Sequence, residues 1–134
     1  MKYMLEIDST QASVLINALD LYSRIHIGQF TEILKPFRFS KKVEIKDVRA
    51  AEHMLDAVKF LLTGFEYGVS YGIHSEEVSD DARVAYDLQQ VIRNVQSHTE
   101  RPLKKGDWRG VNYDTPFTSS TTHPELAKME PAGE

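Results

Sequence analysis

The chain of 134 residues contains no cysteine, which excludes disulfide bonds and thiolate metal ligands. It also lacks an uncharged apolar run of the roughly 18 residues that a membrane-spanning helix needs. Its first residues, MKYMLEIDSTQ, carry acids where a secretory signal peptide requires an apolar stretch. We therefore expect a protein of the cytoplasm that does not bind membranes.

Signatures of catalysis are missing as well. The sequence has no glycine-rich phosphate loop and no serine-nucleophile elbow. None of its five histidines lies three or four residues from another, the spacing that places two metal ligands on one helix face. We expect a protein that is not an enzyme, with no catalytic residue, no cofactor and no metal site, and an enzyme of nucleotide metabolism is the third alternative.

Hydrophobic periodicity predicts three helices, over about residues 9–25, 47–65 and 79–98. The first has room to continue through Gly28 as far as Leu34, and Pro36 closes it. Two short alternating segments, KYMLEI at 2–7 and KKVEIK at 41–46, predict β-strands. The expected fold is therefore mainly α (α+β), a three-helix core with one or two short N-terminal strands and an extended C-terminal arm. For the second helix, the sequence predicts a core stripe of Ala51, Met54, Leu55, Val58, Leu61, Leu62 and Phe65.

The chain divides into a single helical domain at 1–100 and an extended, partly disordered arm at 101–134. The arm is rich in proline and in serine and threonine, a composition that rarely packs a core by itself. Trp108, Tyr113 and Phe117 are nevertheless too apolar for a free tail. We expect the arm to dock by these aromatics on its own domain or on a neighbouring subunit, and the Ser/Thr run at 119–122 to be dispensable.

If Gly28 lay inside a helix, it would make that helix less stable by about 1 kcal/mol than an alanine at the same position. One interpretation is structural, in which the helix ends there or another backbone approaches closely. The other is functional, in which Arg24, His26 and Gln29 form a polar rim around exposed backbone. Antiparallel packing of the first and third helices would in addition bring Arg24 to Asp87.

The basic stretch at 35–49, KPFRFSKKVEIKDVR, is the most uneven in charge. Aromatics between basic groups are typical of surfaces that follow a nucleic-acid backbone. A strand edge protected by lysines explains the pattern without a partner, and an acidic protein surface is a further alternative. The net charge of −4 argues against nonspecific duplex binding. The partner-binding candidates in this stretch are Lys35, Arg38, Lys41 and Lys42.

Three stretches carry a resemblance: ALDLYSRIHIGQF at 18–30, ARVAYDLQQVIR at 82–93 and DWRGVNYDTPF at 107–117. They resemble small proteins of tailed bacteriophages and prophages that have no assigned activity. The resemblance implies a phage origin and an accessory role in the infected cell, including action on a host system. The leading hypothesis is a non-enzymatic, homo-oligomeric protein that acts by protein–protein contact in the host cytoplasm. The alternative is a nucleic-acid-binding module that uses residues 35–49.

Overall fold

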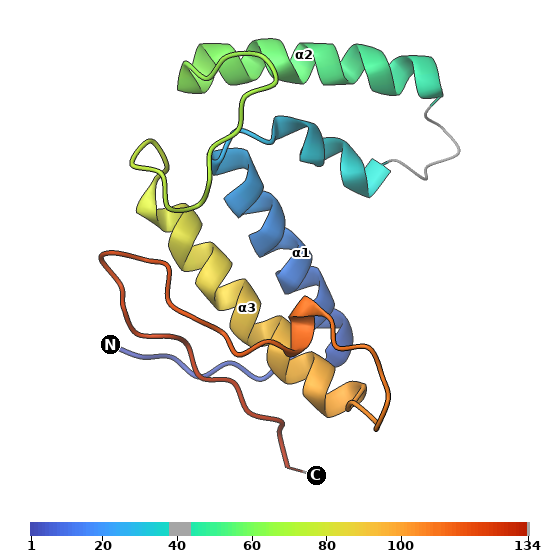
Figure 1. Cartoon of the computed structure of the whole chain (residues 1–134), viewed down its shortest axis with the longest axis vertical. Coiled ribbons are helices and arrows are strands. Elements are labelled where there is room, and N and C mark those ends of the chain that lie inside the picture. Colours follow the sequence, from blue (N-terminus) through green and yellow to red (C-terminus); the bar gives the residue numbers. More distant parts are fainter. Residues whose placement is uncertain (38–43, 134) are drawn as a thin grey trace.

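A computed structural model describes residues 1–37 and 44–133 of the chain. Helices α1 and α3 lie side by side, whereas η1 and α2 lie across one end of that pair (Figure 1). The arm returns along α3, so that both termini lie near the opposite end (Figure 1). The elements are α1 (Ser9–His26), the 3-10 helix η1 (Phe30–Phe37), α2 (Ile45–Thr63), α3 (Asp80–Glu100) and the 3-10 turn η2 (Val111–Tyr113). The prediction of a mainly helical protein is confirmed.

The β part of the predicted fold is wrong for the residues that the structure describes. Residues 2–7 run as a segment without strand pairing, exposed up to Glu6 and half-buried at Ile7. An ion pair between Lys2 and Glu125 ties this segment to the arm. Of the second predicted strand, residues 41–43 lie outside the described residues, and Glu44 is the N-cap of α2. Alternation alone does not make a strand, because its backbone groups need a paired neighbour.

Helices α1 and α3 form the body of the protein in antiparallel arrangement (Figure 1). A capping box between Asp8 and Gln11 begins α1, and Ser79 caps α3 as its sequence predicts. A small buried residue lies near each end of the helix pair, since Ala12 near the start of α1 and Ala82 near the start of α3 are among the most buried side chains. The rest of the buried apolar residues of α3 are Ala85, Val91 and Ile92.

Hydrogen bonds join α1 and α3 at both ends of this helix pair. At one end, the hydroxyl of Ser23 donates to the carbonyl of Ala82 at 3.1 Å. At the other end, the Gln96 side-chain amide donates to the Ser9 carbonyl and the Ser13 hydroxyl, both at 3.1 Å. Contacts at both ends fix the register of the two helices.

Helix α1 ends before Gly28 and does not continue to Leu34. Gly28 has φ +89°, the left-handed conformation that favours glycine and ends helices. A Cβ there would lie 2.9 Å from Cδ2 of Phe65 and 3.1 Å from the carbonyl oxygen of Val69. The structural interpretation of Gly28 therefore holds, and the segment that it touches is the linker after α2.

This junction fastens α2 to the body. The backbone amide of Tyr71 donates to the carbonyl of Ile27 at 2.8 Å, and the Phe65 and Tyr71 rings pack with centroids 4.4 Å apart. From α2, the Lys59 ammonium donates to the Val69 carbonyl at 2.9 Å. Linker residues 65–71 therefore contact both the end of α1 and the inner face of α2.

Substitution Gly28→Ala tests this junction. The added methyl group meets the Phe65 ring and the Val69 carbonyl while the backbone stays in a conformation unfavourable for alanine, so we expect a loss of about 1–3 kcal/mol in unfolding free energy. The measurement is thermal and urea unfolding. Gly72→Ala is the matched control, because a Cβ at that position would have nothing within 4 Å of it; an equal loss in both variants would contradict the role of Gly28.

Candidate functional site

Helix α2 presents an apolar face to solvent. Leu61 is 80% exposed and Met54 69% exposed, although both belong to the stripe that the sequence assigns to the core. Of that stripe, Phe65 is buried and Ala51 and Leu55 are half-buried. Phe60, which is next to the stripe, is exposed as well. The remaining members of the stripe are all exposed: Met54, Val58, Leu61 and Leu62.

The opposite face of α2 explains why this apolar face points outward. Lys59 is only 2% exposed, since its ammonium is held by the Val69 carbonyl and lies 3.6 Å from the Asp56 carboxylate. A buried ammonium must keep such partners, which fixes the rotation of the helix about its own axis. The inner face rests on η1 and the linker, and no other described element covers the outer one (Figure 1).

The outward face has the spacing of a helix-packing seam. Ala50, Met54, Ala57 and Leu61 follow one another at intervals of four, three and four residues, the a/d repeat with which one helix packs against another. All four are exposed, and none carries a charge. We call these four residues the α2 seam.

A pocket lies beside the seam, next to stacked rings of His53 and Tyr67 whose centroids are 6.4 Å apart. The Phe60 and Tyr67 rings are both exposed, and the seam residues Ala57 and Leu61 share the same depression. The combination of exposed aromatics with an aliphatic ridge is typical of a protein-binding surface. The pocket is lined by His53, Asp56, Ala57, Phe60, Leu61 and Tyr67.

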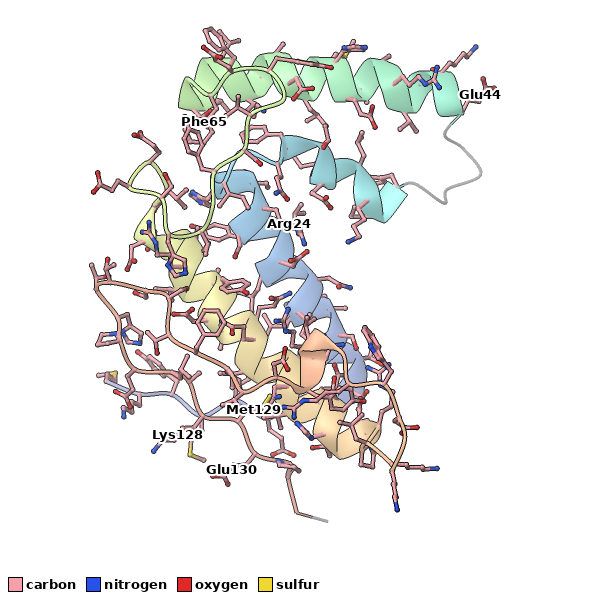
Figure 2. The ribbon with its side chains drawn as sticks, in the orientation of Figure 1. Arg24, Glu44, Phe65, Lys128, Met129 and Glu130 are labelled. Atoms are coloured by element: carbon pink, nitrogen blue, oxygen red, sulfur yellow. The ribbon has the colours of Figure 1, made fainter. Side chains whose placement is uncertain are left out.

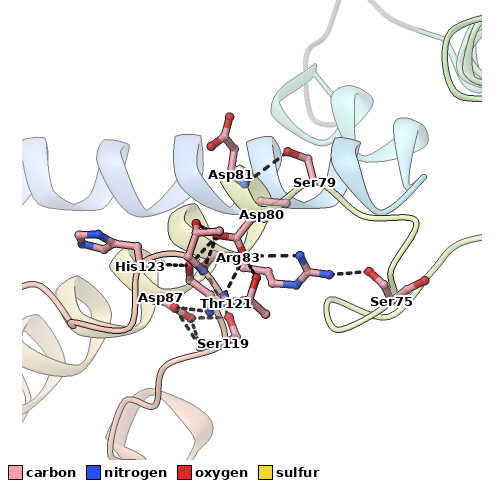
Figure 3. Close-up of polar contacts among 12 residues, drawn as sticks. Ser75, Ser79, Asp80, Asp81, Arg83, Asp87, Ser119, Thr121 and His123 are labelled. Atoms are coloured by element: carbon pink, nitrogen blue, oxygen red, sulfur yellow. Dashed lines mark hydrogen bonds and ion pairs between the residues drawn. The ribbon is translucent and has the colours of Figure 1, made fainter.

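The C-terminal arm docks on α3 of its own chain, and Asp87 is its main anchor. The Asp87 carboxylate accepts the backbone amides of Ser119, at 2.9 Å, and Ser120, at 3.0 Å, together with the Ser119 hydroxyl (Figure 3). Asp87 is buried, so these bonds replace its lost hydration. The Arg24–Asp87 pair expected from the sequence is therefore wrong.

Asp80, two turns before Asp87, binds the next arm residues. Its carboxylate accepts the Ser120 hydroxyl at 2.7 Å, the Thr121 amide at 2.9 Å and the Thr122 hydroxyl (Figure 3). The Thr122 hydroxyl, the Thr121 amide and the Ser120 hydroxyl hold the pKa of Asp80 well below its usual value of 3.8. The Ser/Thr run, predicted to be dispensable, is the segment that the two carboxylates bind; we call this set of contacts the arm latch.

The arm aromatics contribute less than their size predicts. Trp108 is 88% exposed, whereas Tyr113 lies edge-on to His98 with centroids 5.1 Å apart. Phe117 is exposed on one side and edge-on to Tyr86, and its backbone is held by Gln90, which donates to its carbonyl at 3.1 Å. Docking of the arm thus depends on hydrogen bonds with α3 side chains, accepted by Asp80 and Asp87 and donated by Gln90.

The predicted rim around Gly28 is assembled in part. The Arg24 guanidinium donates to Oε1 of Gln29 at 2.7 Å and to Asp20 at 2.9 Å. The His26 ring packs on Tyr22 with centroids 4.6 Å apart. Arg24 and Gln29 satisfy each other, and the half-buried His26 rests on the exposed Tyr22 ring, which favours a structural role at the end of α1.

Of the basic stretch, two described lysines form ion pairs with neighbouring acids. Lys35 lies 4.0 Å from Glu32, and Lys46 lies 3.4 Å from Glu44. The exposed Phe37 ends η1. Arg38, Lys41 and Lys42 lie outside the described residues.

The apolar face of α2 and the arm latch on α3 each have a signal in the sequence, but periodicity alone does not reveal what either surface contacts. In α2 the apolar residues cover a wider arc than one contact can bury, which is a sign of a second contact. In α3 the seven-residue spacing of Asp80 and Asp87 places them on one face. The sequence shows neither which apolar arc faces the body nor that the Ser/Thr run meets these acids.

Substitution Asp87→Asn tests the arm latch. The asparagine turns a donor toward backbone amides, and each hydrogen bond to a charged group contributes about 1.5–3 kcal/mol, so we expect a loss of about 3 kcal/mol in unfolding free energy. Trypsin cleavage after Lys128 should become faster, since release of the arm exposes that segment. Asp81→Asn is the control, because its carboxylate points away from the arm (Figure 3); equal effects in both variants would contradict the latch.

The pKa of Asp80 predicts how stability depends on pH. Because its folded-state pKa is depressed, Asp80 contributes stability that is fully present above its usual pKa of 3.8 and is lost as the pH falls below that value. The melting temperature of the wild type should therefore fall more steeply on acidification than the melting temperature of Asp80→Asn. Parallel profiles for the two proteins would show that Asp80 does not hold the arm.

Similarity to other proteins adds no assignment. No protein-family model matches the chain, and none of the curated proteins or solved structures matches it either. No helix among the described residues is long and apolar enough to cross a membrane. Within the same residues, no three histidine, aspartate or glutamate side chains gather as a metal site would require.

Proposed function

We propose that the protein is not an enzyme and acts by protein–protein contact through the outward apolar face of α2. The observation that carries the proposal is the exposure of the α2 seam on a helix whose other face is anchored. Soluble monomers rarely expose contiguous apolar patches of more than a few hundred Å² without an interaction partner. The exposed Phe60 and Leu62 beside the seam enlarge the apolar patch on this helix.

The energetics favour occupation of this surface. Full burial of one Leu, Met or Phe side chain stabilises an association by about 1.5–3 kcal/mol. The α2 seam offers Met54 and Leu61, which project from one helix face, so no loop has to be ordered on binding. Such preorganisation lowers the entropy cost of association.

The proposed setting is an accessory protein of phage origin in the host cytoplasm, acting in a way that includes modulation of a host system. Its support is the resemblance of residues 18–30, 82–93 and 107–117 to phage and prophage proteins. Two of these stretches have a structural role: residues 18–30 contain Gly28 of the junction with the linker, and residues 82–93 contain Asp87, which anchors the arm. Their sequence pattern thus maintains the platform that carries α2.

The alternative function, nucleic-acid binding by residues 35–49, gains no support from the described contacts. Lys35 and Lys46 both lie beside acids of their own segment, which reduces the positive charge available for phosphates. The rest of that prediction depends on Arg49, which is exposed on α2, and on Arg38, Lys41 and Lys42, which lie outside the described residues.

Photo-crosslinking in bacterial cells tests the proposed function. With a benzophenone amino acid in place of the exposed Phe60, we expect a defined protein adduct, since the apolar face is occupied in the cell. The matched control carries the same group at Val14, which is exposed on α1 and away from α2. The Phe60 adduct should disappear when Leu61→Arg places a charge in the contact.

Three results would contradict the proposal. They are the absence of any protein adduct from position 60, equal adducts from positions 60 and 14, and an adduct that survives Leu61→Arg. Adducts with nucleic acid alone would favour the alternative function. The Leu61 side chain is mostly in solvent, so the Arg variant is expected to fold as the wild type does.

A further inference from the structure

We infer that the partner of the α2 seam is a second copy of this chain, with the two α2 helices packed antiparallel about a two-fold axis. This inference rests on the proposed function and names the partner of the same surface. The axis crosses the seam midway between Met54 and Ala57. A two-fold contact uses the same patch on both subunits, so the patch must be complementary to itself.

The order of small and large residues in the seam supplies that complementarity. About this axis, Ala50 faces Leu61 of the partner subunit, and Met54 faces Ala57 of the partner subunit. Every layer then sets one alanine against one long side chain, the alternation that lets packed helices interdigitate. All four residues are exposed in the single chain, so nothing has to move for them to meet.

Parallel packing of the same helices is unfavourable. It would set alanine against alanine in two layers, and methionine or leucine against itself in the other two. The alanine layers would leave voids and the other layers would crowd, and both errors weaken a helix interface. The seam is therefore complementary to its own reverse.

Charges agree with the antiparallel arrangement. The seam carries none, so no ion has to be desolvated between the helices. At each end, the exposed Lys46 comes next to the C-terminal end of the partner's α2, where free carbonyl groups favour a cation. Glu66, exposed just beyond that helix end, adds an opposite charge within reach.

The size of the contact sets its strength. The seam spans about 16 Å of helix, and with the flanking Val58 and Phe60 it buries on the order of 500 Å² per copy, less than the roughly 800 Å² per partner of a standard stable interface. The expected dimer is therefore reversible and dissociates on dilution. A shallow contact of this kind leaves the arm and the α1–α3 body unchanged.

A size exchange across the seam tests the arrangement, with sedimentation velocity over a wide concentration range as the measurement. Met54→Ala alone sets alanine against alanine, and Ala57→Met alone sets methionine against methionine, so each should raise the dimer dissociation constant at least about tenfold. The double variant restores one large and one small residue in each layer and should return within about threefold of the wild type. Val14→Ala on α1 is the control and should leave dimerisation unchanged.

The outcomes separate this inference from the proposed function. A wild type that stays monomeric at every concentration overturns the inference, while a protein adduct at position 60 still supports the proposed function through a foreign partner. A dimer that ignores the single variants, or a double variant weaker than both, also overturns it. Unfolding curves of the diluted monomers check that all variants fold, since every substituted side chain is exposed.

Discussion

The left-handed turn at Gly28, closed by the Phe65 ring, is the constraint on which the exposed face of α2 depends. It stops α1, and it leaves room for the linker after α2 to reach the end of α1. Lys59 completes the junction from the other side, because its ammonium has to stay with the Val69 carbonyl. Together these contacts determine which face of α2 points inward and which is left uncovered.

The two ends of the molecule are stabilised by different physics. Around α1 and α3, small residues allow close helix contact, and the carboxylates of Asp80 and Asp87 hold the arm by hydrogen bonds. The charged form of the Asp80 carboxylate is stabilised by these bonds, as its lowered pKa shows. The outward face of α2 has few polar groups that could bond to a partner, so a complex formed there has to be stabilised by apolar burial. Figure 2 shows the side chains of α2 projecting from the end of the molecule opposite the arm.

The separation of the arm latch from the α2 seam has a functional consequence. A partner on α2 meets a helix whose inner face is already packed, and it does not compete with the arm for α3. The buried charges of Lys59 and Asp87 face inward or toward the arm, so neither is exposed to a partner at the seam. The platform can therefore stay folded whether or not the seam is occupied.

The sequence by itself determined the helices, since hydrophobic periodicity and the caps at Asp8 and Ser79 are local signals. It also singled out Gly28, without deciding whether the helix ends there, and it predicted that the arm is irregular. Tertiary structure decided the rest: residues 2–7 found no strand partner, and the Ser/Thr run met Asp80 and Asp87 across more than thirty residues of sequence. It also turned Met54 and Leu61 outward, because an apolar residue is attracted equally to a core and to an interface. Only the anchors of Lys59 and Phe65 decide between those two environments.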